Sequence, residues 1–481
     1  MAVPSEARGA GGGKGLARPA RGGSPPTQIR VRMAPSPTGF VHLGSARTAL
    51  FDYLFARRQA GVFVLRVEDT DEARNQPHFE TAIYEGLHWL GLRWEEGPDV
   101  GGAYGPYRQS ERMDLYREAA ASLLKAGAAY RCYCTKEELD AEREAARAAG
   151  RPYKYSRRCL TNPPVGRDQF TVRFQVPAGE VRWDDLVRGE VVFDLDTIGD
   201  FIVMRADATP LYNFSVAVDD ARMEISHVFR GEEHISNTPA QLLILEALGH
   251  PRPTYAHLPV IVGQDRQKLS KRKHPETRLA LYQELGYLPE AMVNYLALLG
   301  WNAGTEQEIF TLAELEEVFD IARVQRSSAM FDWQKLDWLN GHYIRQLSAE
   351  ELAARLAPFL PELQPDLVRR AVPALQERLR RLADARELLE YLWTDPAAPD
   401  LEVADRDKVR AALAGLDGVA WEPEPIQAAL DALREREGWS RNALFKPVRR
   451  AVTGRDISPP IHDTLALLPR EEAFRRLSRV L

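Results

Sequence analysis

The chain has 481 residues, of which 44% are hydrophobic and 27% are charged, so we expect a globular protein with more than one domain. Its formal net charge is -6, which argues against a protein that coats nucleic acid indiscriminately, although local basic patches can still bind phosphate. No apolar run is long enough to cross a bilayer, and the few cysteines do not make a disulfide framework. We therefore expect a cytoplasmic protein without a membrane partner.

The first residues are rich in Gly, Pro, Ala and Arg and contain no apolar segment of the secretory type. We expect a disordered tail over 1–28, or a start site that was assigned too early. A transit peptide is disfavoured because the segment has little amphipathic pattern.

A strand, a helix and a second strand are predicted over residues 29–67. Apolar alternation predicts the first strand, which ends in a turn rich in Pro and Gly, and helical spacing of apolar residues begins at His42. The apolar run 62–67 predicts the second strand. This βαβ order begins a parallel sheet, whose ligands bind at the carboxyl ends of the strands. The polar residues at that edge are Ser36, Thr38 and Glu68.

Residues from about 110 to 195 indicate an insertion, because they are rich in charge and contain all the cysteines. The sheet pattern resumes at 201–204 and 225–229, and a strand at 258–262 leads into a cationic loop. After this loop strands are scarce and helical periodicity dominates to the end. The pattern predicts an α/β part followed by an all-α part.

The segment from Thr38 to Gly44 has the features of a phosphate-binding helix start. Gly39 and Gly44 let the backbone approach a ligand closely, and a helix N-terminus offers unpaired N–H groups to phosphate. His42 could donate a hydrogen bond to an oxygen that gains charge in a transition state. The alternative is a Pro/Gly turn with a capping threonine and a surface histidine.

A second candidate for phosphate binding is the cationic loop Lys268-Leu269-Ser270-Lys271-Arg272. Lysines act there as mobile point charges, which suits a loop that closes and reopens. A solvated basic loop is the alternative. The buried-strand pattern before the loop and the hinge at Gly263 favour phosphate binding.

Five polar residues stand at the ends of predicted strands and are expected to converge on one site. They are Arg32, Ser36, Glu68, Tyr212 and Arg230. Arg230 could pair bidentately with a substrate carboxylate, and Glu68 could hold an ammonium group. For each residue taken singly, the alternative is an ordinary rim residue or a structural ion pair.

The cysteines form an incomplete zinc-binding pattern. Cys132, Cys134 and Cys159 supply three of the four ligands that structural zinc needs, and Tyr155 is a candidate for the fourth. Two interpretations stay open: a zinc site with these four ligands, or three free cysteines without metal.

Arginines that cluster at 369–381 and 449–455 could contact nucleic acid or form solvated helix faces.

Taken together, these motifs resemble the bacterial glutamyl-tRNA synthetases, which are class I aminoacyl-tRNA synthetases. The run 34–44, with Leu43 following His42, resembles the HIGH signature of that family, and the loop from Lys268 resembles its KMSKS signature. The resemblance covers residues 29–481. Further family-like runs lie at 66–71, 105–110, 212–214, 218–220 and 230–234.

The resemblance implies a fold of the α/β plus all-α class. A Rossmann-type catalytic domain with an acceptor-binding insertion would be followed by helical stem-contact and anticodon-binding domains. The expected boundaries are 29–110 and 199–255 for the two halves of the catalytic domain, 111–198 for the insertion with the cysteines, 256–340 for the KLSKR loop and stem-contact region, and 341–390 and 391–481 for the two helical anticodon-binding domains.

It also implies a two-step reaction, in which ATP and L-glutamate form glutamyl-adenylate and the glutamyl group then passes to the terminal adenosine of tRNA-Glu. Glutamate would be bound by the five polar residues named above, with Arg230 on the side-chain carboxylate. Catalysis would use His42, Lys268 and Lys271, and Mg²⁺ would accompany ATP. The ATP-binding residues would be Thr38, Gly39, His42, Gly44, Glu233, Lys268, Leu269, Ser270 and Lys271.

The resemblance leaves the choice of tRNA open. We expect a monomeric enzyme that discriminates against tRNA-Gln, because Arg378 aligns loosely with an arginine of discriminating members. A non-discriminating enzyme is the alternative. A truncated paralogue that modifies tRNA-Asp and a small-molecule nucleotidyltransferase are disfavoured by the long helical part, and a non-catalytic tRNA-binding relative by the two ATP-binding segments.

Overall fold

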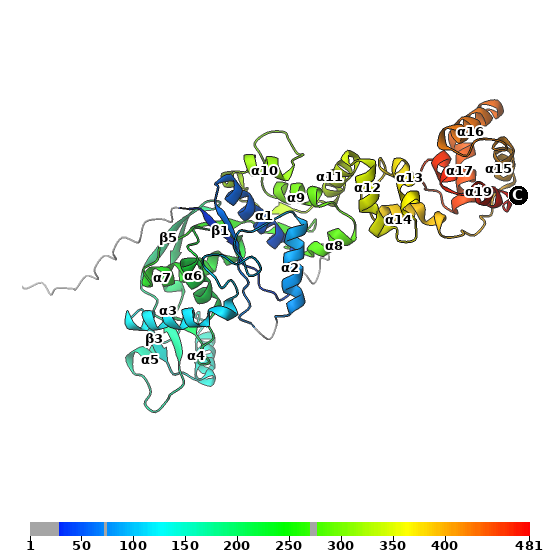
Figure 1. Ribbon diagram of the computed structural model, residues 1–481. Coiled ribbons are helices and arrows are strands. Elements are labelled where there is room, and N and C mark those ends of the chain that lie inside the picture. The colour runs from blue at the N-terminus through cyan, green and yellow to red at the C-terminus, as the bar shows by residue number, and fades with distance from the viewer. Residues whose placement is uncertain (1–27, 72–74, 270–276) are drawn as a thin grey trace, which may run out of the picture.

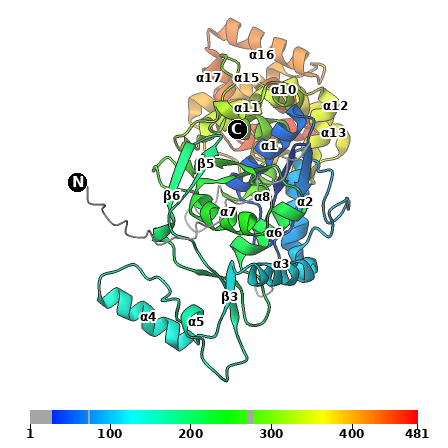
Figure 2. The same cartoon turned by 90° about the vertical axis from the view of Figure 1, so that its left-hand side faces the viewer.

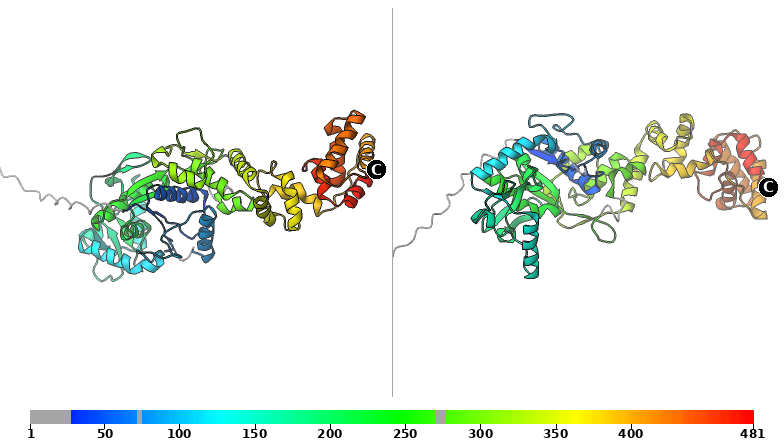
Figure 3. Two further views of the ribbon diagram at one scale, coloured as in Figure 1. Left: turned by 45° about the horizontal axis from the view of Figure 1, so that its top comes forward. Right: turned by 90° about the horizontal axis from the view of Figure 1, so that it is seen from below.

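The computed structural model describes residues 28–71, 75–269 and 277–481 (Figure 1). The expected tail over 1–28 lies outside these residues except for Gln28. The first half of the chain forms a mixed α/β body, and the last helices extend from it as a long arm (Figures 1 and 3). Among the described helices, none combines the length and the low charge needed to span a bilayer.

Parallel strands support the candidate site. In the described part of the chain the strands are β1 (Arg30–Met33), β2 (Val62–Leu65), β3 (Ala129–Cys132), β4 (Thr171–Phe174), β5 (Glu180–Asp185), β6 (Gly189–Asp194), β7 (Phe201–Met204), β8 (His227–Gly231), β9 (Thr254–Leu258), β10 (Ile261–Val262) and β11 (Ala329–Met330). β1 pairs in parallel with β2, and β8 pairs in parallel with β9. β1 also lies beside β8, because Ser226 N donates to the Arg30 carbonyl at 2.9 Å.

The strand predicted at 201–204 forms, but the expectation that it resumes the parallel sheet is wrong. It is β7, which pairs antiparallel with β4 in a three-stranded sheet of the order β3-β4-β7. Conversely, the hairpin β5–β6 from the expected insertion joins the sheet of β8 and β9 through a parallel contact of Asp185 with Tyr255. A short apolar run indicates a strand but does not indicate which sheet it joins.

Helices cover the strands and form the arm. Those of the α/β body are α1 (Leu43–Arg58), α2 (Pro77–Trp89), α3 (Met113–Lys125), α4 (Lys136–Ala148), α5 (Arg158–Thr161), α6 (Tyr212–Arg222) and α7 (Thr238–Ala247). The later helices are α8 (Leu279–Glu284), α9 (Pro289–Leu298), α10 (Leu312–Val318), α11 (Trp333–Gln346), α12 (Ala349–Leu356), α13 (Pro365–Leu375), α14 (Asp384–Leu389), α15 (Val403–Gly415), α16 (Pro423–Glu437), α17 (Arg441–Thr453), α18 (Ile461–Leu467) and α19 (Arg470–Ser478).

The helix α1 connects β1 to β2, as the sequence predicts. Its buried side chains Ala46, Leu50 and Leu54 recur every four residues, which is the spacing of one helix face. Burial of this face fixes the helix against the sheet and holds its N-terminus at the carboxyl edge of β1. The predicted helical character of the part after the cationic loop is also confirmed, since β11, with two residues, is the one strand among its described residues.

The buried apolar side chains form separate clusters. One lies around α1, β1 and the helices α8 to α11, and another lies between the insertion strands and the helices α3, α6 and α7. A third runs through the arm from Leu288 to Val480. A small fourth cluster surrounds the cysteines beside β3, α4 and α5, which protrude from the body in Figure 2.

Candidate active site

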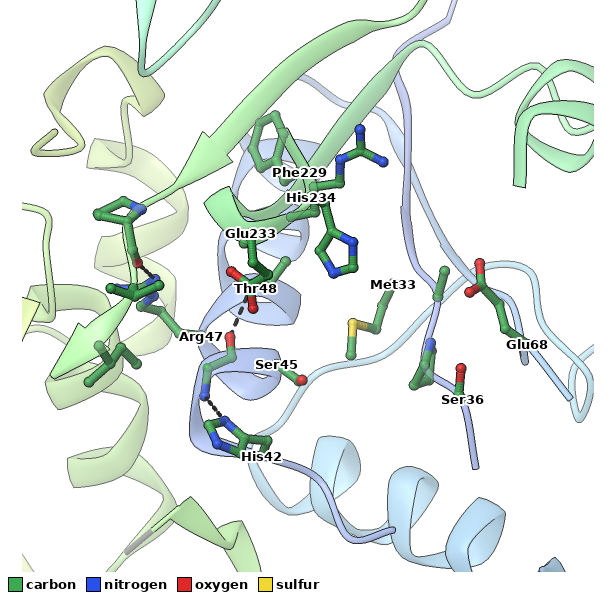
Figure 4. Close-up of a pocket in the computed structure, with 18 of the residues that line it drawn as sticks. Met33, Ser36, His42, Ser45, Arg47, Thr48, Glu68, Phe229, Glu233 and His234 are labelled. Carbon is green, nitrogen blue, oxygen red and sulfur yellow. Dashed lines mark hydrogen bonds between the residues drawn. The ribbon is translucent and has the colours of Figure 1, made fainter. Parts of the chain in front are cut away.

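A cavity of about 460 Å³ opens at the carboxyl ends of β1, β2 and β8. Figure 4 shows its wall, formed by the start of α1, the ends of these strands and the segment after β9. Most of the predicted site residues line it: Arg32, Ser36, His42, Gly44, Glu68, Tyr212, Arg230, Glu233, Lys268 and Leu269. Thr38 and Gly39 lie in the turn before α1 and are not among the lining residues. Ser270 and Lys271 lie outside the described residues.

His42 caps the helix that faces the cavity. Its Nδ1 accepts a hydrogen bond from the Gly44 N–H at 3.0 Å, so the ring proton of the neutral imidazole is on Nε2 (Figure 4). A Cβ atom on residue 44 would stand 3.3 Å from that Nδ1, which explains why glycine suits the position. The cap therefore sets the tautomer in which His42 is a hydrogen-bond donor through Nε2.

Arg47 is a cavity residue that the sequence analysis missed. It extends from α1 toward the cavity (Figure 4). Its guanidinium donates to the carbonyls of Leu299, at 3.1 Å, and Pro259. Burial lowers its pKa to about 10, against the opposing charges of Glu233 and Glu232. The signal that could have identified it is its place in α1: a basic residue next to the buried apolar positions of the helix is expected to have a specific polar partner.

Arg32 and Glu68 belong to a buried ionic network beneath the cavity. Arg32 pairs with Asp220 at 3.1 Å, and Arg66 pairs with Asp220 at 2.7 Å and with Glu68 at 3.2 Å. Burial raises the pKa of Glu68, although the nearby charges of Arg66 and Arg32 oppose that shift. Both residues thus line the cavity and form structural ion pairs, so the two interpretations of their role are compatible.

Tyr212 lies at the first turn of α6 and not at the end of a strand, so that expectation was wrong. The strand before it ends at Met204, and residues 205–211 form the connection. Its side chain nevertheless reaches the cavity, where its hydroxyl lies 3.4 Å from Nδ1 of His234.

Arg230 is buried at the end of β8, and none of the described carboxylates pairs with it. It donates to three neutral acceptors: Nε to His257 Nε2 at 3.0 Å, Nη1 to Gln241 Oε1 at 2.8 Å and Nη2 to Thr238 Oγ1 at 2.7 Å. Burial lowers the pKa of its guanidinium. A buried cation without a carboxylate partner would be stabilised by an anionic ligand.

Lys268 and Glu233 meet across the cavity at 3.1 Å. Burial opposes ionisation of Glu233, but its own backbone N–H and the hydrogen bond from Lys268 outweigh that effect and lower its pKa. The loop begins at a fixed place, because Leu269 N donates to the Ile261 carbonyl at 3.0 Å. A Cβ atom at residue 231 would meet the carboxylate of Glu233, so a larger residue there would require this side chain to move.

The predicted metal ligands converge in the insertion, away from this cavity. The sulfur atoms of Cys132, Cys134 and Cys159 lie within 4.8 Å of one another. The Tyr155 hydroxyl is 3.4 Å from the first sulfur and 3.2 Å from the second. Burial opposes ionisation of Cys132, but its hydrogen bond with Tyr155 and a backbone N–H lower the pKa of this thiol to about 7. Four soft or polar donors around one point fit a tetrahedral zinc ion.

Arg378 is exposed in the turn after α13 and lies near Arg449 of α17. Burial and the charge of Arg378 both lower the pKa of Arg449, whose Nε donates to Ser458 Oγ at 3.0 Å. Several other arginines of the two clusters are instead in ion pairs with carboxylates, as the solvated-face interpretation predicts. Examples are Arg369 with Asp366, Arg381 with Asp384 and Arg455 with Glu387.

Comparison with known proteins gives one consistent family. The profile described as "tRNA synthetases class I (E and Q), catalytic domain" matches residues 28–338, and "Anticodon binding domain" matches residues 351–481. A "Glutamate--tRNA ligase" of Symbiobacterium thermophilum is 45% identical over 94% of this chain and 99% of its own length. One of Moorella thermoacetica is 42% identical over 94% and 98%.

The same relationship holds for solved structures. A glutamate tRNA ligase from Elizabethkingia meningosepticum, crystallised in complex with its amino acid, superimposes with a TM-score of 0.84 at 30% identity. The superposition covers 94% of this chain and 99% of that one.

Proposed function

This chain belongs to the glutamate--tRNA ligases of the class I tRNA synthetases, and from that premise we propose how its cavity attaches glutamate to tRNA-Glu. In the first step the α-carboxylate of glutamate attacks the α-phosphate of ATP, giving glutamyl-adenylate and pyrophosphate. In the second step the terminal adenosine of the tRNA takes the glutamyl group. Neither step needs a nucleophile from the protein, so positioning and charge stabilisation carry the catalysis.

The observation that carries the choice of amino acid is the unpaired charge of Arg230. A glutamate side-chain carboxylate would accept the N–H groups that its three neutral partners leave, one on each terminal nitrogen. Glutamine would leave the buried cation uncompensated and present an amide N–H₂ to a donor, which a polar site rejects strongly.

The α-amino group of glutamate would bind at Glu68, with Arg32, Ser36 and Tyr212 around the rest of the amino acid. The raised pKa of Glu68 supports this, because burial disfavours its carboxylate and a further positive charge would stabilise it. An ammonium group beside it would supply that charge. Arg32 would act from its pair with Asp220, so that its orientation is set before glutamate arrives.

ATP would lie between the start of α1 and the Lys268 loop. His42 would donate through Nε2 to a phosphate oxygen, and the N-terminus of α1 near Gly44 would favour the same negative charge. Lys268 would exchange its ion pair with Glu233 for contacts with the phosphates of ATP. The Glu233 carboxylate could then accept hydrogen bonds from hydroxyl or amino groups of ATP. We assign Thr38, Gly39, Leu269, Ser270 and Lys271 to ATP binding on the family motifs alone.

Mg²⁺ would enter with ATP. Among the described residues no group of three carboxylates lines the cavity, so the ion would be held mainly by phosphate oxygens and water, as Mg²⁺ commonly is. Its chemistry would be to neutralise phosphate charge as pyrophosphate leaves.

Zinc is proposed as a structural ion of the insertion. Cys132, Cys134, Tyr155 and Cys159 would hold it, and the N–H donor of Arg158, 3.1 Å from the Cys134 sulfur, would stabilise the thiolate. The role of the ion would be to join β3 to α5, which otherwise share only a small buried cluster.

The tRNA would contact both ends of the molecule, with the insertion 111–198 on the acceptor end and the helices 341–481 on the anticodon. Arg378 and Arg449 support an anticodon contact, because the repulsion between two neighbouring cations would be relieved by a phosphate anion of the tRNA. We propose a monomer of the cytoplasm that discriminates against tRNA-Gln. Efficient formation of Glu-tRNA-Gln with purified tRNA would overturn that discrimination.

The experiment that tests the function is ATP–pyrophosphate exchange with glutamate and with glutamine, each with and without tRNA-Glu. We expect exchange with glutamate only, followed by charging of tRNA-Glu. Exchange with glutamine at a comparable rate would contradict the role of Arg230. A folded protein that exchanges with neither amino acid would contradict the proposed reaction.

A further inference from the structure

His257 and Asp185 form a chain of hydrogen bonds behind Arg230. His257 Nδ1 lies 2.5 Å from Asp185 Oδ2, and both side chains are almost completely buried. A carboxylate can only accept, so Nδ1 carries the proton and Nε2 is left as an acceptor. That acceptor receives the Arg230 Nε–H at 3.0 Å. The tautomer of His257 therefore follows from Asp185.

Asp185 is held as a carboxylate. Burial opposes its ionisation, but the hydrogen bonds from His257 and from backbone N–H groups outweigh that effect and lower its pKa. Its Oδ1 accepts the N–H of Val187 at 3.0 Å, of Arg188 at 2.9 Å and of His257 at 3.2 Å. The charge is thus fixed in place by the β5–β6 turn.

The comparison with Arg32 shows what this arrangement achieves. Arg32 donates directly to both oxygens of Asp220, which neutralises it. Arg230 instead contacts the neutral ring of His257, whose tautomer is set by Asp185. This contact orients the guanidinium without neutralising its charge, which remains available to an anionic ligand. The ring of Tyr255 lies parallel to that of His257, and the Arg230 Cζ stands 5.1 Å from its centroid. This aromatic contact stabilises a cation without neutralising it.

We propose that Asp185 and His257 are positioning residues that aim Arg230 at the side-chain carboxylate of the amino acid and thereby set the preference for glutamate over glutamine. The inference rests on the proposed function. His257 accepts the Nε–H of the guanidinium, Gln241 and Thr238 each accept one N–H of a terminal nitrogen, and the remaining N–H of each terminal nitrogen is left for the substrate. Without them the guanidinium could rotate toward water and lose the bidentate geometry that a carboxylate needs.

The sharpest test is Asp185→Asn, which keeps the size of the side chain. Its oxygen can still accept the backbone N–H groups, but its amide would donate to His257 Nδ1 and force the ring proton onto Nε2. Two donors would then face each other at Arg230 Nε. We expect the KM for glutamate in exchange with tRNA-Glu to rise by about tenfold or more, and the ratio of kcat/KM for glutamate over glutamine to fall. The KM for ATP should change less than about twofold.

A pair of changes at His257 separates positioning from packing. His257→Gln keeps one donor and one acceptor at similar spacing and should retain most of the preference for glutamate. His257→Leu keeps the bulk without either group and should lose it. The control is His227→Gln in β8, the strand that also contains Arg230; this half-buried histidine contacts Ser226 and has no hydrogen bond to Arg230. It should leave both KM values as in the wild type.

Three results would overturn the inference while leaving the proposed function intact. One is a folded Asp185→Asn enzyme with an unchanged KM for glutamate. Another is a rise of both KM values by the same factor, which would indicate a general loss of structure. The third is equal impairment by His257→Gln and His257→Leu, a readout that also decides the matter if Asp185→Asn does not fold. Wild-type enzyme that fails to exchange with glutamate would instead contradict the proposed function.

Discussion

Arg32 and Arg230 are almost equally buried, with 5% and 6% of their surface exposed, yet their surroundings differ. Arg32 has a carboxylate partner and is part of the structural network below the cavity. Arg230 has only neutral partners, which satisfy its hydrogen bonds but not its charge. The electrostatic cost of keeping such a cation buried is offset when an anionic substrate binds, so it favours binding of a carboxylate over a neutral amide.

Asp52 of α1 allows a test of buried charge outside the active site. Both of its carboxylate oxygens are buried without a hydrogen-bond partner among the described residues, and burial raises its pKa well above the usual 3.8. The folded protein therefore binds this proton more tightly than the unfolded chain, so Asp52 contributes stability at low pH that is lost as the pH rises. Asp52→Asn should raise the free energy of unfolding at pH 7.5 by about 1 kcal/mol or more and have little effect near pH 3.5.

Urea unfolding of both proteins at several pH values would measure this difference. Its size should grow between the ordinary pKa of an aspartate and the raised pKa of Asp52. A difference that is the same at every pH would show that Asp52 is ionised in the folded protein, contrary to the interpretation of its surroundings.

Lys268 is expected to act on ATP. Lys268→Ala removes the cation that faces Glu233 and should cut adenylate formation at least tenfold, or about 1.4 kcal/mol of transition-state stabilisation, with tRNA affinity nearly unchanged. Exchange kinetics and a filter-binding assay with tRNA-Glu would measure the two effects. Arg58→Ala, which removes an exposed cation at the other end of α1, is the control and should match the wild type. Equal exchange rates in Lys268→Ala and wild type would argue against the role.

The chemistry of the site could be predicted from residue types, but the hydrogen bonds that join its side chains could not. Arg230 at a predicted strand end indicated carboxylate binding, and the structure places it in the cavity. Its acceptor His257 is in the next strand, and Asp185 belongs to a hairpin 72 residues before His257. Such contacts depend on which strands pair, and apolar periodicity in one segment contains no information about its partner.

At the scale of elements, the hairpin β5–β6 and the strand β7 are each in the sheet that the sequence did not predict for them. The hairpin pairs with the sheet that supports the cavity, and β7 closes the small sheet of the insertion. The strands and α1 were predictable because their apolar residues follow the periods of a strand and of a helix. The membership of each sheet was not, since β5, β6 and β7 are short runs, and a short run does not indicate its partner strand.

The metal site can be tested on the insertion as an element. We expect one zinc ion for each chain by elemental analysis, and Cys159→Ala should lose it because three ligands rarely retain structural zinc. Removal of the metal should lower the Tm of the transition that belongs to the insertion. Tyr155→Phe should weaken zinc retention against a chelator, whereas Tyr153→Phe should not, because the Tyr153 hydroxyl donates to Glu142 and not to a cysteine among the described residues. Wild-type protein without zinc would contradict the proposal.

At the scale of the whole molecule, the α/β body and the helical arm are joined in line, so the cavity and the exposed arginines of the arm lie far apart (Figures 1 and 3). A tRNA is long enough to contact both, which is consistent with matches to a catalytic profile and an anticodon profile in one chain. Changes at the far end of the arm are therefore expected to act on tRNA affinity and not on the binding of small substrates.

Arg378→Ala tests this separation. We expect the KM for tRNA-Glu in aminoacylation to rise about tenfold, with the KM for ATP unchanged at saturating tRNA, because an arginine contact to a base or phosphate contributes about 1–3 kcal/mol. Arg369→Ala is the matched control, since that side chain is exposed in the same cluster and is paired with Asp366. The assignment of Arg378 would fail if both changes altered the KM for tRNA by the same factor.

The apolar clusters of the α/β body and of the arm affect how the stability of this protein can be measured. The cluster around α1 and the one around α3, α6 and α7 cover opposite faces of β2, β8 and β9 and should melt together, whereas the arm cluster contains no residue of these strands. Heating should therefore produce more than one calorimetric peak and a calorimetric enthalpy larger than the van't Hoff value of any single peak. A single melting temperature would then be an average over the unfolding transitions of different parts of the molecule. The effect of Asp52→Asn belongs to the peak of the α/β body, which contains the cluster around α1.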